Sequence, residues 1–563
     1  MKNPLITQNL EPYVAAIVGE QRRFQTDGLV ARIWNRDHTV WKDTDAEISN
    51  RLGWLDAPSA SVECVAEAEA FASEIRAEGF TDVLLLGMGG SSLAPEVFSR
   101  IFGSATDGVR LHVLDSTDPA AVLRLDRSLP EGKTLYLVSS KSGTTLETAS
   151  LMNFYFSRVL GRIGRARAGQ SFAAITDPGS FLEAEARRLD FRRIFPGDPN
   201  IGGRFSVFSP FGLVPAALIR VDIRPLLGAA DRAAASCRRR DPAENPGTNL
   251  GIILGTLARA GRDKAVFLLS PELRSLGAWI EQLVAESTGK EGRGILPLVR
   301  PTGAPIPGPT SDRFYVSIGG ADDESLAETT RVAVRSGDPV LAMTLGGPPD
   351  IGAQFYLWEF ATAAAGAVLG INPFDQPNVA LAKKKTDEAL KTFREAGSFP
   401  AEDPSEEDET IVFYGEGLES DIPAGLQPFI DRSESGGYFT IQAFLPPGEE
   451  IAEALRRLAG RIETRTGRPV SFDFGPRFLH STGQLHKGDR GSGVFLQLTA
   501  DHPEDAAVPS TPDGAASGFT FGNLIDAQSL GDRRALREKC RRIARLHFKT
   551  RIVEGIFAAA DRL

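Results

Sequence analysis

The stretch from Ser139 to Thr148 reads SSKSGTTLET and combines six hydroxyl side chains with one lysine. It follows a short apolar run and precedes a helical pattern. Hydroxyls, the free N–H groups of a helix start and one cation together suit a phosphate monoester dianion. A serine-rich helix cap is the alternative, but a cap needs only one hydroxyl. The GxxxxGKS/T spacing of a nucleotide-binding loop is absent. We therefore expect a phosphate site with these candidate residues: Ser140, Lys141, Ser142 and Thr145.

Two glycine-containing stretches could lie close to a ligand. GMGGSS, from Gly87 to Ser92, follows an apolar run, and its glycines would let N–H groups approach a ligand closely. GGRFS, from Gly202 to Ser206, could place the guanidinium of Arg204 beside a ligand. A tight turn or an ordinary surface loop explains either stretch equally well when it is considered alone.

Glu286 is the candidate general base. Gln282 and Glu286 are four residues apart, so a helix would place them on one face, while Ile280, Leu283 and Val284 form an apolar face. A carboxylate at the C-terminal end of a helix meets the negative end of the dipole, which favours proton uptake. The alternative is a solvated surface glutamate, which is the commoner fate of this residue type.

A later stretch, NPFDQPNVALAKKK from Asn372 to Lys385, begins with residues typical of a helix start. Three lysines follow, and most of them should simply be solvated.

The composition indicates a globular protein, with 42% hydrophobic and 24% charged residues. The net charge of -10 disfavours general nucleic-acid binding. Three distant cysteines and no CxxC pair support neither a zinc site nor a secreted disulfide scaffold, and no His, Cys or acidic cluster has convincing ligand spacing. No signal peptide is visible, and the longest small-apolar run is far shorter than the roughly 20 residues that span a bilayer. We expect a cytoplasmic protein that needs no metal.

Short apolar runs alternate with helical stretches along most of the chain. Buried strands separated by helices predict parallel sheets with both faces covered. Residues 1–75 read as a helical cap, and the acidic stretch PAEDPSEEDE (400–409) reads as a linker. The expected domains are thus the cap at 1–75, α/β units at 76–222 and 245–400, and a smaller α/β extension at 410–563. In that extension we expect helices at about 448–465 and 530–548.

Together, the five stretches resemble the glucose-6-phosphate isomerase family, which has two sugar-isomerase (SIS-type) subdomains. GMGGSSLAPEVF is similar to the family's first glycine loop, SSKSGTTLET to its phosphate loop and GGRFSVFSPFG to its arginine motif. AESTGKEGRG resembles its catalytic glutamate motif, and NPFDQPNVALAKKK its late glutamine and lysine motif. The resemblance covers roughly residues 80–400. It implies an α/β fold with two SIS-type doubly wound parallel-sheet subdomains plus the C-terminal unit.

The resemblance also implies a role for each matching residue. Glu286 would be the base, Arg204 would lie near the reacting C1–C2 oxygens, and Lys383 would assist ring opening. Gln282 would hold the sugar and Gln376 would help to position it. Six further residues would contact substrate, chiefly its phosphate: Gly90, Ser91, Ser140, Lys141, Ser142 and Thr145.

One departure from the family concerns its catalytic histidine, which usually lies between the glutamate and lysine motifs. This chain has no histidine between His112 and His480. QLHKG followed by VFLQLT, at 484–488 and 494–499, is similar to the missing segment. We infer that the histidine has moved into the extension, with His486 favoured and His480 in a supporting role. Residues 32–55 and the extension resemble the isomerase half of transaldolase–isomerase fusion proteins.

The expected function is the reversible conversion of D-glucose 6-phosphate to D-fructose 6-phosphate through a cis-enediol, in glycolysis and gluconeogenesis, without a cofactor. The expected partner is a small sugar phosphate, with neither nucleic acid nor membrane, and a homodimer is compatible with the family. The sequence leaves open whether His486 acts in its own subunit.

Two alternative functions belong to other classes of protein. A non-catalytic sugar-phosphate sensor would keep the phosphate loop but could lose the base. A nucleic-acid binder would use the basic run from Arg533 to Arg551. In that run Leu536, Cys540, Ile543 and His547 follow a helical period, so we expect a docked helix with a solvated basic face.

Overall fold

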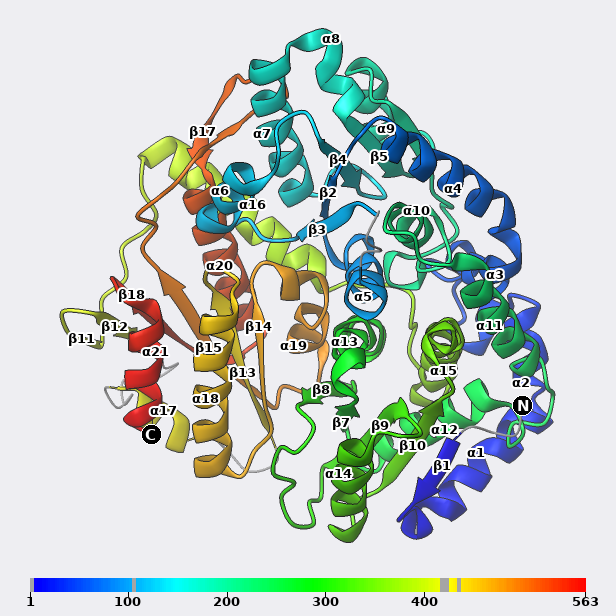
Figure 1. The fold of residues 1–563 in the computed structure, drawn as a ribbon. Coiled ribbons are helices and arrows are strands. Elements are labelled where there is room, and N and C mark those ends of the chain that lie inside the picture. Colours follow the sequence, from blue (N-terminus) through cyan, green and yellow to red (C-terminus); the bar gives the residue numbers. More distant parts are fainter. Residues whose placement is uncertain (1–4, 104–107, 416–424, 433–436) are drawn as a thin grey trace. The chain divides into compact units, whose positions relative to one another are not determined.

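The computed structural model describes residues 5–103, 108–415, 425–432 and 437–563. The chain divides into two compact units, whose helices and strands are labelled in Figure 1. The first unit comprises residues 1–114, 130–148 and 165–376, and the second comprises 115–129, 149–164 and 377–563. The four-part domain division expected from the sequence stays a prediction.

The first unit contains a five-stranded sheet whose strands are short apolar runs. Its strands lie in the order β3-β2-β4-β5-β6 and are all parallel. Every residue of β2, β4 and β5 is buried, so both faces of the sheet are covered, as a parallel sheet requires. The strands are β2 (Asp82–Gly87), β3 (Arg110–Leu114), β4 (Thr134–Ser139), β5 (Phe172–Thr176) and β6 (Arg193–Pro196).

A second sheet of the first unit has the order β1-β10-β9-β7-β8. Its strands are parallel except for β1, which pairs antiparallel with β10. The N-terminal residues therefore supply an edge strand as well as the expected helices. The strands are β1 (Leu5–Gln8), β7 (Lys264–Leu269), β8 (Leu296–Arg300), β9 (Arg313–Gly320) and β10 (Val340–Leu345).

Helices of the first unit surround one continuous apolar core. Almost every residue of α15 is buried, yet no helix in the described part of the chain is long and apolar enough to cross a bilayer. The helices are α1 (Val14–Thr26), α2 (Leu29–Trp34), α3 (Ala57–Ala60), α4 (Val62–Ala77), α5 (Leu93–Phe102), α8 (Arg165–Ala168), α9 (Phe181–Arg188), α10 (Pro210–Leu218), α11 (Ile223–Ser236), α12 (Pro246–Arg259), α13 (Arg274–Thr288), α14 (Glu324–Arg335) and α15 (Ile351–Leu369).

The second unit has its own core around a mixed sheet of order β11-β12-β18-β15-β13-β14. A smaller α/β unit was expected at 410–563, and this stretch contains both strands and helices. The strands are β11 (Glu406–Glu407), β12 (Ile411–Tyr414), β13 (Tyr438–Phe444), β14 (Val470–Phe474), β15 (Gly493–Ala500) and β18 (Arg542–Phe548), and β16 (Ala507–Pro509) pairs with β17 (Ala516–Thr520) in a separate hairpin.

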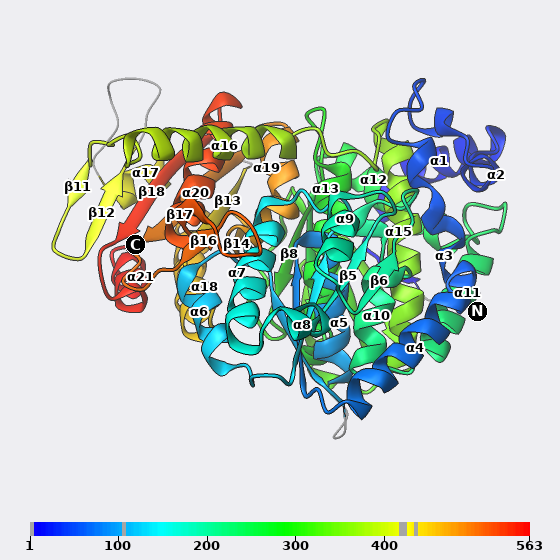
Figure 2. The ribbon, with the colours of Figure 1, turned by 90° about the horizontal axis from the view of Figure 1, so that it is seen from above.

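Helix α16 packs against α20 in this unit (Figure 2). The phosphate-loop helix α7 starts in the first unit and continues into the second. The helices are α6 (Pro119–Ser128), α7 (Leu146–Ile163), α16 (Val379–Ala396), α17 (Leu426–Asp431), α18 (Glu449–Thr466), α19 (Gly483–Gly488), α20 (Phe521–Glu538) and α21 (Ile552–Asp561).

The helix expected at 530–548 is wrong in its second half. Helix α20 ends at Glu538, a turn through Cys540 follows with φ +54°, and β18 begins at Arg542. Ile543 and His547 fit a helical period by coincidence, because β18 pairs with both β12 and β15 and is held by the sheet. The basic run is therefore a helix end and a central strand, without one solvated face.

Candidate active site

Glu286 lies in the last turn of α13, as the sequence predicts. The apolar residues of α13 pack into the core of the first unit, and this orientation also turns Gln282 and Glu286 inward. Gln282 Nε2 donates a hydrogen bond to Glu286 Oε2 at 3.0 Å. Both side chains are buried, with Gln282 4% and Glu286 7% exposed. The carboxylate is thus shielded and oriented by its own helix.

Arg204 brings a fixed positive charge to this carboxylate. It lies in the short helix η7 (Gly203–Phe205), and its Nη1 is 3.3 Å from Glu286 Oε1. Nε donates to Ser287 Oγ at 2.7 Å, and Nη1 donates to Gln376 Oε1 at 2.9 Å. Burial lowers the pKa of Arg204, although Glu286 opposes this shift. A guanidinium held on several sides is preorganised to stabilise negative charge.

The loop after α15 completes this cluster. Arg204 Nη2 donates to the carbonyls of Pro373 and Asp375 at 2.7 and 3.0 Å. Lys290 Nζ donates to the Asp375 carbonyl and to its Oδ1, both at 2.6 Å. Burial and the charge of Arg204 lower the pKa of Lys290 to about 8, and Asp375 opposes them. Gln376 is therefore held beside Arg204.

Sequence reasoning missed Ser287, Lys290 and Asp375, although all three lie inside the motifs that it singled out. Ser287 and Lys290 closely follow Glu286, and Asp375 precedes Gln376. Their roles depend on contacts between segments about 85 residues apart, which spacing alone does not reveal.

The first glycine loop lies against the arginine loop at Gly90. A Cβ on Gly90 would be 2.0 Å from the carbonyl oxygen of Gly203, so only glycine fits there. On its other side, Ser139 Oγ donates to the carbonyl of Ser91 at 3.2 Å. The glycine loop thereby connects the end of β4 to Arg204.

The phosphate loop joins β4 to α7, as predicted. Gly143 has φ +72°, and a Cβ there would be 2.4 Å from the backbone nitrogen of Leu182. Ser140 Oγ accepts the N–H of Gly143 at 3.1 Å, which stabilises the turn. Ser142 is exposed and Thr145 half-buried, so both can reach a ligand at the start of the helix.

Lys141 is oriented differently from the other candidates of this loop. Its Nζ donates to Asp177 Oδ1 at 2.8 Å and to the carbonyl of Asp198 at 3.0 Å. Burial lowers the pKa of Lys141, and the neighbouring Asp177 opposes this shift. The ammonium group therefore braces the loop in this structure.

The remaining candidates lie in the second unit. Lys383 is exposed on α16. The backbone N–H of Asn378, just before α16, donates to Gln484 Oε1 of α19 at 2.8 Å. This bond connects the segment of Lys383 to the segment of His486 within that unit.

The two histidines have contrasting surroundings. His486 is fully buried, with its ring near those of Phe495, Phe478 and Tyr438, at centroid distances of 5.1, 6.1 and 6.4 Å. Neither ring nitrogen has a hydrogen-bond partner among the described residues. Burial, with the charge of Lys487, lowers the pKa of His486 well below its ordinary value. His480 ends the short helix η10 (Arg477–His480) and is half-exposed.

Comparisons with known proteins identify related sequences. A family model described as "Phosphoglucose isomerase" matches residues 67–294. The glucose-6-phosphate isomerase of Rubrobacter xylanophilus is 31% identical over 369 residues, which are 56% of this chain and 84% of that protein. The enzyme of Carboxydothermus hydrogenoformans is 30% identical over 393 residues, with 60% and 84% covered.

Solved structures resemble the chain in fold. A hypothetical protein of Thermus thermophilus aligns with a TM-score of 0.58 and 24% identity, covering 69% of this chain and 99% of that one. A glucose-6-phosphate isomerase from Chlamydia trachomatis aligns with a TM-score of 0.52 and 22% identity, covering 66% and 79%. The sequence relatives carry the family assignment, and on their evidence the chain belongs to the phosphoglucose isomerase family.

Proposed function

We propose that this chain catalyses the reversible isomerisation of D-glucose 6-phosphate to D-fructose 6-phosphate through a cis-enediol. The observation that carries this proposal is the buried carboxylate of Glu286, held between Gln282 at 3.0 Å and Arg204 at 3.3 Å. Its relatives in Rubrobacter and Carboxydothermus bear the name of this activity. The same reaction serves glycolysis and gluconeogenesis.

In this mechanism Glu286 moves one proton between neighbouring carbons. A carboxylate positioned within reach of a carbon-bound proton can act as a general base. It takes the proton from C2 of the open-chain aldose and returns one to C1. Negative charge develops on the C1–C2 oxygens of the intermediate, and the guanidinium of Arg204 stabilises it. Because Arg204 is already held by Ser287 and Gln376, it need not reorganise during the reaction.

The loops around Glu286 would hold the substrate. The hydroxyls of Ser140, Ser142 and Thr145 would contact the phosphate at the start of α7, assisted by N–H groups there. Lys141 would support this loop through its contact with Asp177. The other proposed contacts are Gly90, Ser91, Gln282 and Gln376.

Ring opening needs a second acid–base pair, for which we propose Lys383 and a histidine of the second unit. The motif position favours His486, whereas the half-exposed ring of His480 is the more accessible to a sugar. The cytoplasmic location and the homodimer expected from the sequence belong to this proposal as well.

A non-catalytic sugar-phosphate sensor built on the same subdomains is the second candidate. It needs the phosphate loop but has no use for a buried carboxylate oriented by an amide and a guanidinium. The contacts of Glu286 with Gln282 and Arg204 therefore favour the enzyme.

The test is a coupled assay that starts from fructose 6-phosphate, with chelator and no added metal. Glu286→Gln keeps the shape of the side chain but removes the proton acceptor. A positioned general base contributes about 10²–10⁴-fold, so kcat should fall at least roughly a hundredfold. Glu281→Gln, on the same helix, is the matched control and should retain activity. Near-normal turnover of a folded Glu286→Gln protein would overturn the assignment of the base.

A further inference from the structure

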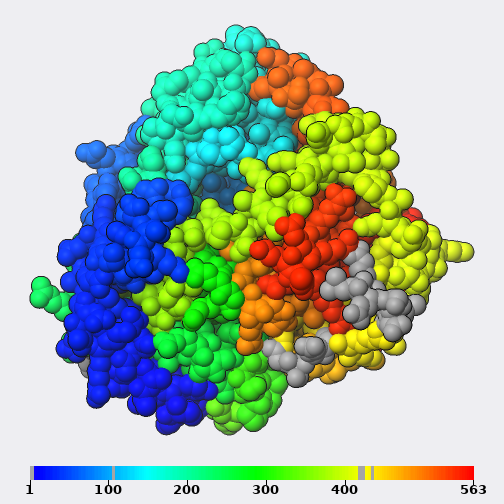
Figure 3. Space-filling model, turned by 180° about the vertical axis from the view of Figure 1, so that it is seen from behind, coloured from blue at the N-terminus to red at the C-terminus, as the bar shows by residue number. Residues whose placement is uncertain are grey.

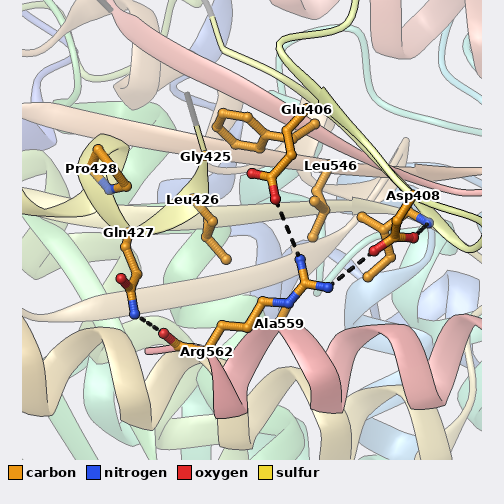
Figure 4. Close-up of a pocket in the computed structure, with 11 residues that line it drawn as sticks. Glu406, Asp408, Gly425, Leu426, Gln427, Pro428, Leu546, Ala559 and Arg562 are labelled. Carbon is orange, nitrogen blue, oxygen red and sulfur yellow. Dashed lines mark hydrogen bonds and ion pairs between the residues drawn. The ribbon is translucent and has the colours of Figure 1, made fainter. Parts of the chain in front are cut away.

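The second unit contains a cavity between the edge of its mixed sheet and the helices α17 and α21 (Figure 4). Its volume is about 510 Å³, which lies within the range of roughly 300–1,000 Å³ that is typical of small-molecule sites. Part of its rim belongs to residues 400–409, which lie almost entirely at the surface next to α16 (Figure 3). A ligand can therefore approach the cavity from solvent.

The inner wall of this cavity is apolar. The sheet contributes Ile411 and Phe413 of β12 and Leu546 of β18, and the helices contribute Leu426 of α17 and Ala559 of α21. All five residues are buried and belong to the apolar core of the second unit. A ligand that fills the cavity would meet apolar atoms over most of its surface, so its body must be apolar as well.

The sheet places a carboxylate at the end of this apolar wall. Glu406 of β11 is paired directly with Phe413 of the antiparallel strand β12, and Phe413 is paired in turn with Leu546 of β18. Residues directly opposite one another in antiparallel strands project to the same face of a sheet, so these three side chains form one row that faces the cavity. Backbone pairing thus fixes an acidic group beside the apolar wall.

Asp408 and Arg562 complete the polar rim of the cavity. Asp408 Oδ1 accepts the N–H groups of Thr410 and Ile411 at 2.8 and 2.7 Å, and these bonds hold the pKa of Asp408 well below its ordinary value. Arg562 Nη2 donates to Asp408 Oδ2 at 3.0 Å, whereas Arg562 Nη1 is 3.9 Å from Glu406 Oε1 (Figure 4). Arg562 is therefore bonded to Asp408 and meets Glu406 at the outer limit of an ion pair.

The charges around the cavity favour a positively charged ligand. The residues that line it carry two carboxylates, those of Glu406 and Asp408, and one guanidinium, that of Arg562. Glu407 projects to the opposite face of β11, where Lys549 Nζ lies 2.6 Å from its Oε1. Because an exposed ion pair contributes little, Glu406 can accept from a ligand cation while the fold stays as it is. A ligand with a carboxylate would instead meet two like charges.

We propose that this cavity binds a small organic amine, with its apolar body between Phe413 and Ala559 and its ammonium group on Glu406. The ammonium would donate a charge-assisted hydrogen bond to the Glu406 carboxylate. Arg562 would keep its bond to Asp408, so binding requires no segment to be displaced. The proposal concerns the second unit by itself and does not rest on the isomerase proposal.

The test is a fluorescence titration of the full-length protein with two probes that share one apolar body. Naphthylmethylamine carries an ammonium group, and naphthylacetate carries a carboxylate. We expect the amine to bind at least about tenfold more tightly than the acid, because the charges of Glu406 and Asp408 attract the first and repel the second. Equal affinities, or tighter binding of the acid, would overturn the proposal.

Charge variants assign the ammonium group to its partner. Glu406→Gln removes that partner and should weaken binding of the amine about threefold, whereas Arg562→Met removes the competing cation and should strengthen it by a similar factor. Glu409→Gln is the matched control, because Glu409 is an exposed acid of the same segment outside the cavity lining. Unchanged affinity in Glu406→Gln, or weaker binding in Arg562→Met, would refute recognition of the ammonium by this rim.

A substitution in the wall locates the apolar body of the probe. Ala559 lies in the cavity wall, so Ala559→Phe would fill part of the space and should abolish binding of naphthylmethylamine. Circular dichroism checks the folding of every variant. Full binding by a folded Ala559→Phe protein would place the probe elsewhere and contradict the proposed site. The comparison of the two probes on the wild type needs no variant and remains decisive if Ala559→Phe does not fold.

Discussion

At the scale of single residues, Lys290 is the cation near Glu286 that can lose its charge in the neutral range. Its side chain is 1% exposed, and its Nζ contacts Asp375, whose carbonyl also accepts from Arg204. The pKa of Lys290 is lowered to about 8 by burial and by Arg204. Below that pH the protonated ammonium holds the Asp375 loop beside Arg204, and above it the ion pair is lost.

We therefore expect kcat to fall as the pH rises through about 8. Lys290→Met should lower kcat about tenfold at pH 7, since a charge-assisted hydrogen bond contributes about 1.5–3 kcal/mol, and it should remove that alkaline fall. Lys42→Met is the control, because Lys42 pairs with the exposed Glu291. A pH profile of kcat for the wild type, Lys290→Met and Lys42→Met tests this expectation. An alkaline fall that persists in Lys290→Met would assign it to another group.

The roles of His480 and His486 can be distinguished by measuring ring opening and proton transfer separately. If His486 has the role of the family's catalytic histidine, His486→Ala should reduce turnover of the cyclic sugar more than it reduces proton exchange from the open-chain sugar. His480→Ala should have a smaller effect on both. The general acid–base contribution sets the expected loss at about a hundredfold or more. Circular dichroism and Tm are needed as controls, because His486 is buried against Phe495. The reverse pattern would transfer the role to His480.

At the scale of elements, the site depends on the close approach of two loops. The helix-starting turn at Gly90 touches the backbone of Gly203, one residue before Arg204. Gly90 contributes space rather than chemistry, because a larger residue at this position would push the backbone of Gly203, and with it Arg204, away from Glu286.

Gly90→Ala should therefore disturb the site. The new Cβ would be 2.0 Å from the Gly203 carbonyl oxygen, and such overpacking typically costs about 1–3 kcal/mol. We expect a lower Tm together with a kcat reduced at least about tenfold. Gly203→Ala is the matched control, since its Cβ would have no atom within 4 Å. Kinetics and thermal unfolding of both variants check this, and equal behaviour would contradict the proposed contact.

At the scale of the whole molecule, the first unit carries an ionisable group in its core. Glu359 of α15 is 0% exposed, and neither carboxyl oxygen has a partner among the described residues. Burial raises the pKa of Glu359 well above its ordinary value. The folded chain therefore keeps this proton at a pH where the unfolded chain loses it.

The sign of the effect on stability follows from proton linkage. Above the ordinary pKa of about 4.5 the unfolded state binds fewer protons than the folded state, so stability falls as the pH rises. Glu359→Gln cannot ionise and should raise Tm at pH 8, with a gain that shrinks towards pH 5. The surface substitution Glu272→Gln should show no such trend. Thermal unfolding at both pH values measures this. A pH-independent difference would mean that Glu359 does not stay protonated.

Much of the fold and of the site was predictable from local patterns. Unalternating apolar runs such as 82–87 and 264–269 are typical of strands buried on both faces, and both are found in parallel sheets. The spacing of Gln282 and Glu286 placed both on one helical face because the helical repeat is local. The glycine- and serine-rich stretches were recognisable for the same reason, since turns and helix starts need particular residues at particular positions.

Contacts between distant segments were decided by the tertiary structure. The pairing of Arg204 with Glu286, and of Lys290 with Asp375, depends on three loops meeting, and no periodicity encodes that. The basic run misled prediction because Ile543 fits a helical period, whereas pairing of β18 with β12 and β15 outweighs such a weak local preference. For the same reason Arg533 and Arg545, which the local pattern leaves in water, are buried around Glu402: burial is set by the whole chain, and charge pairing follows from it.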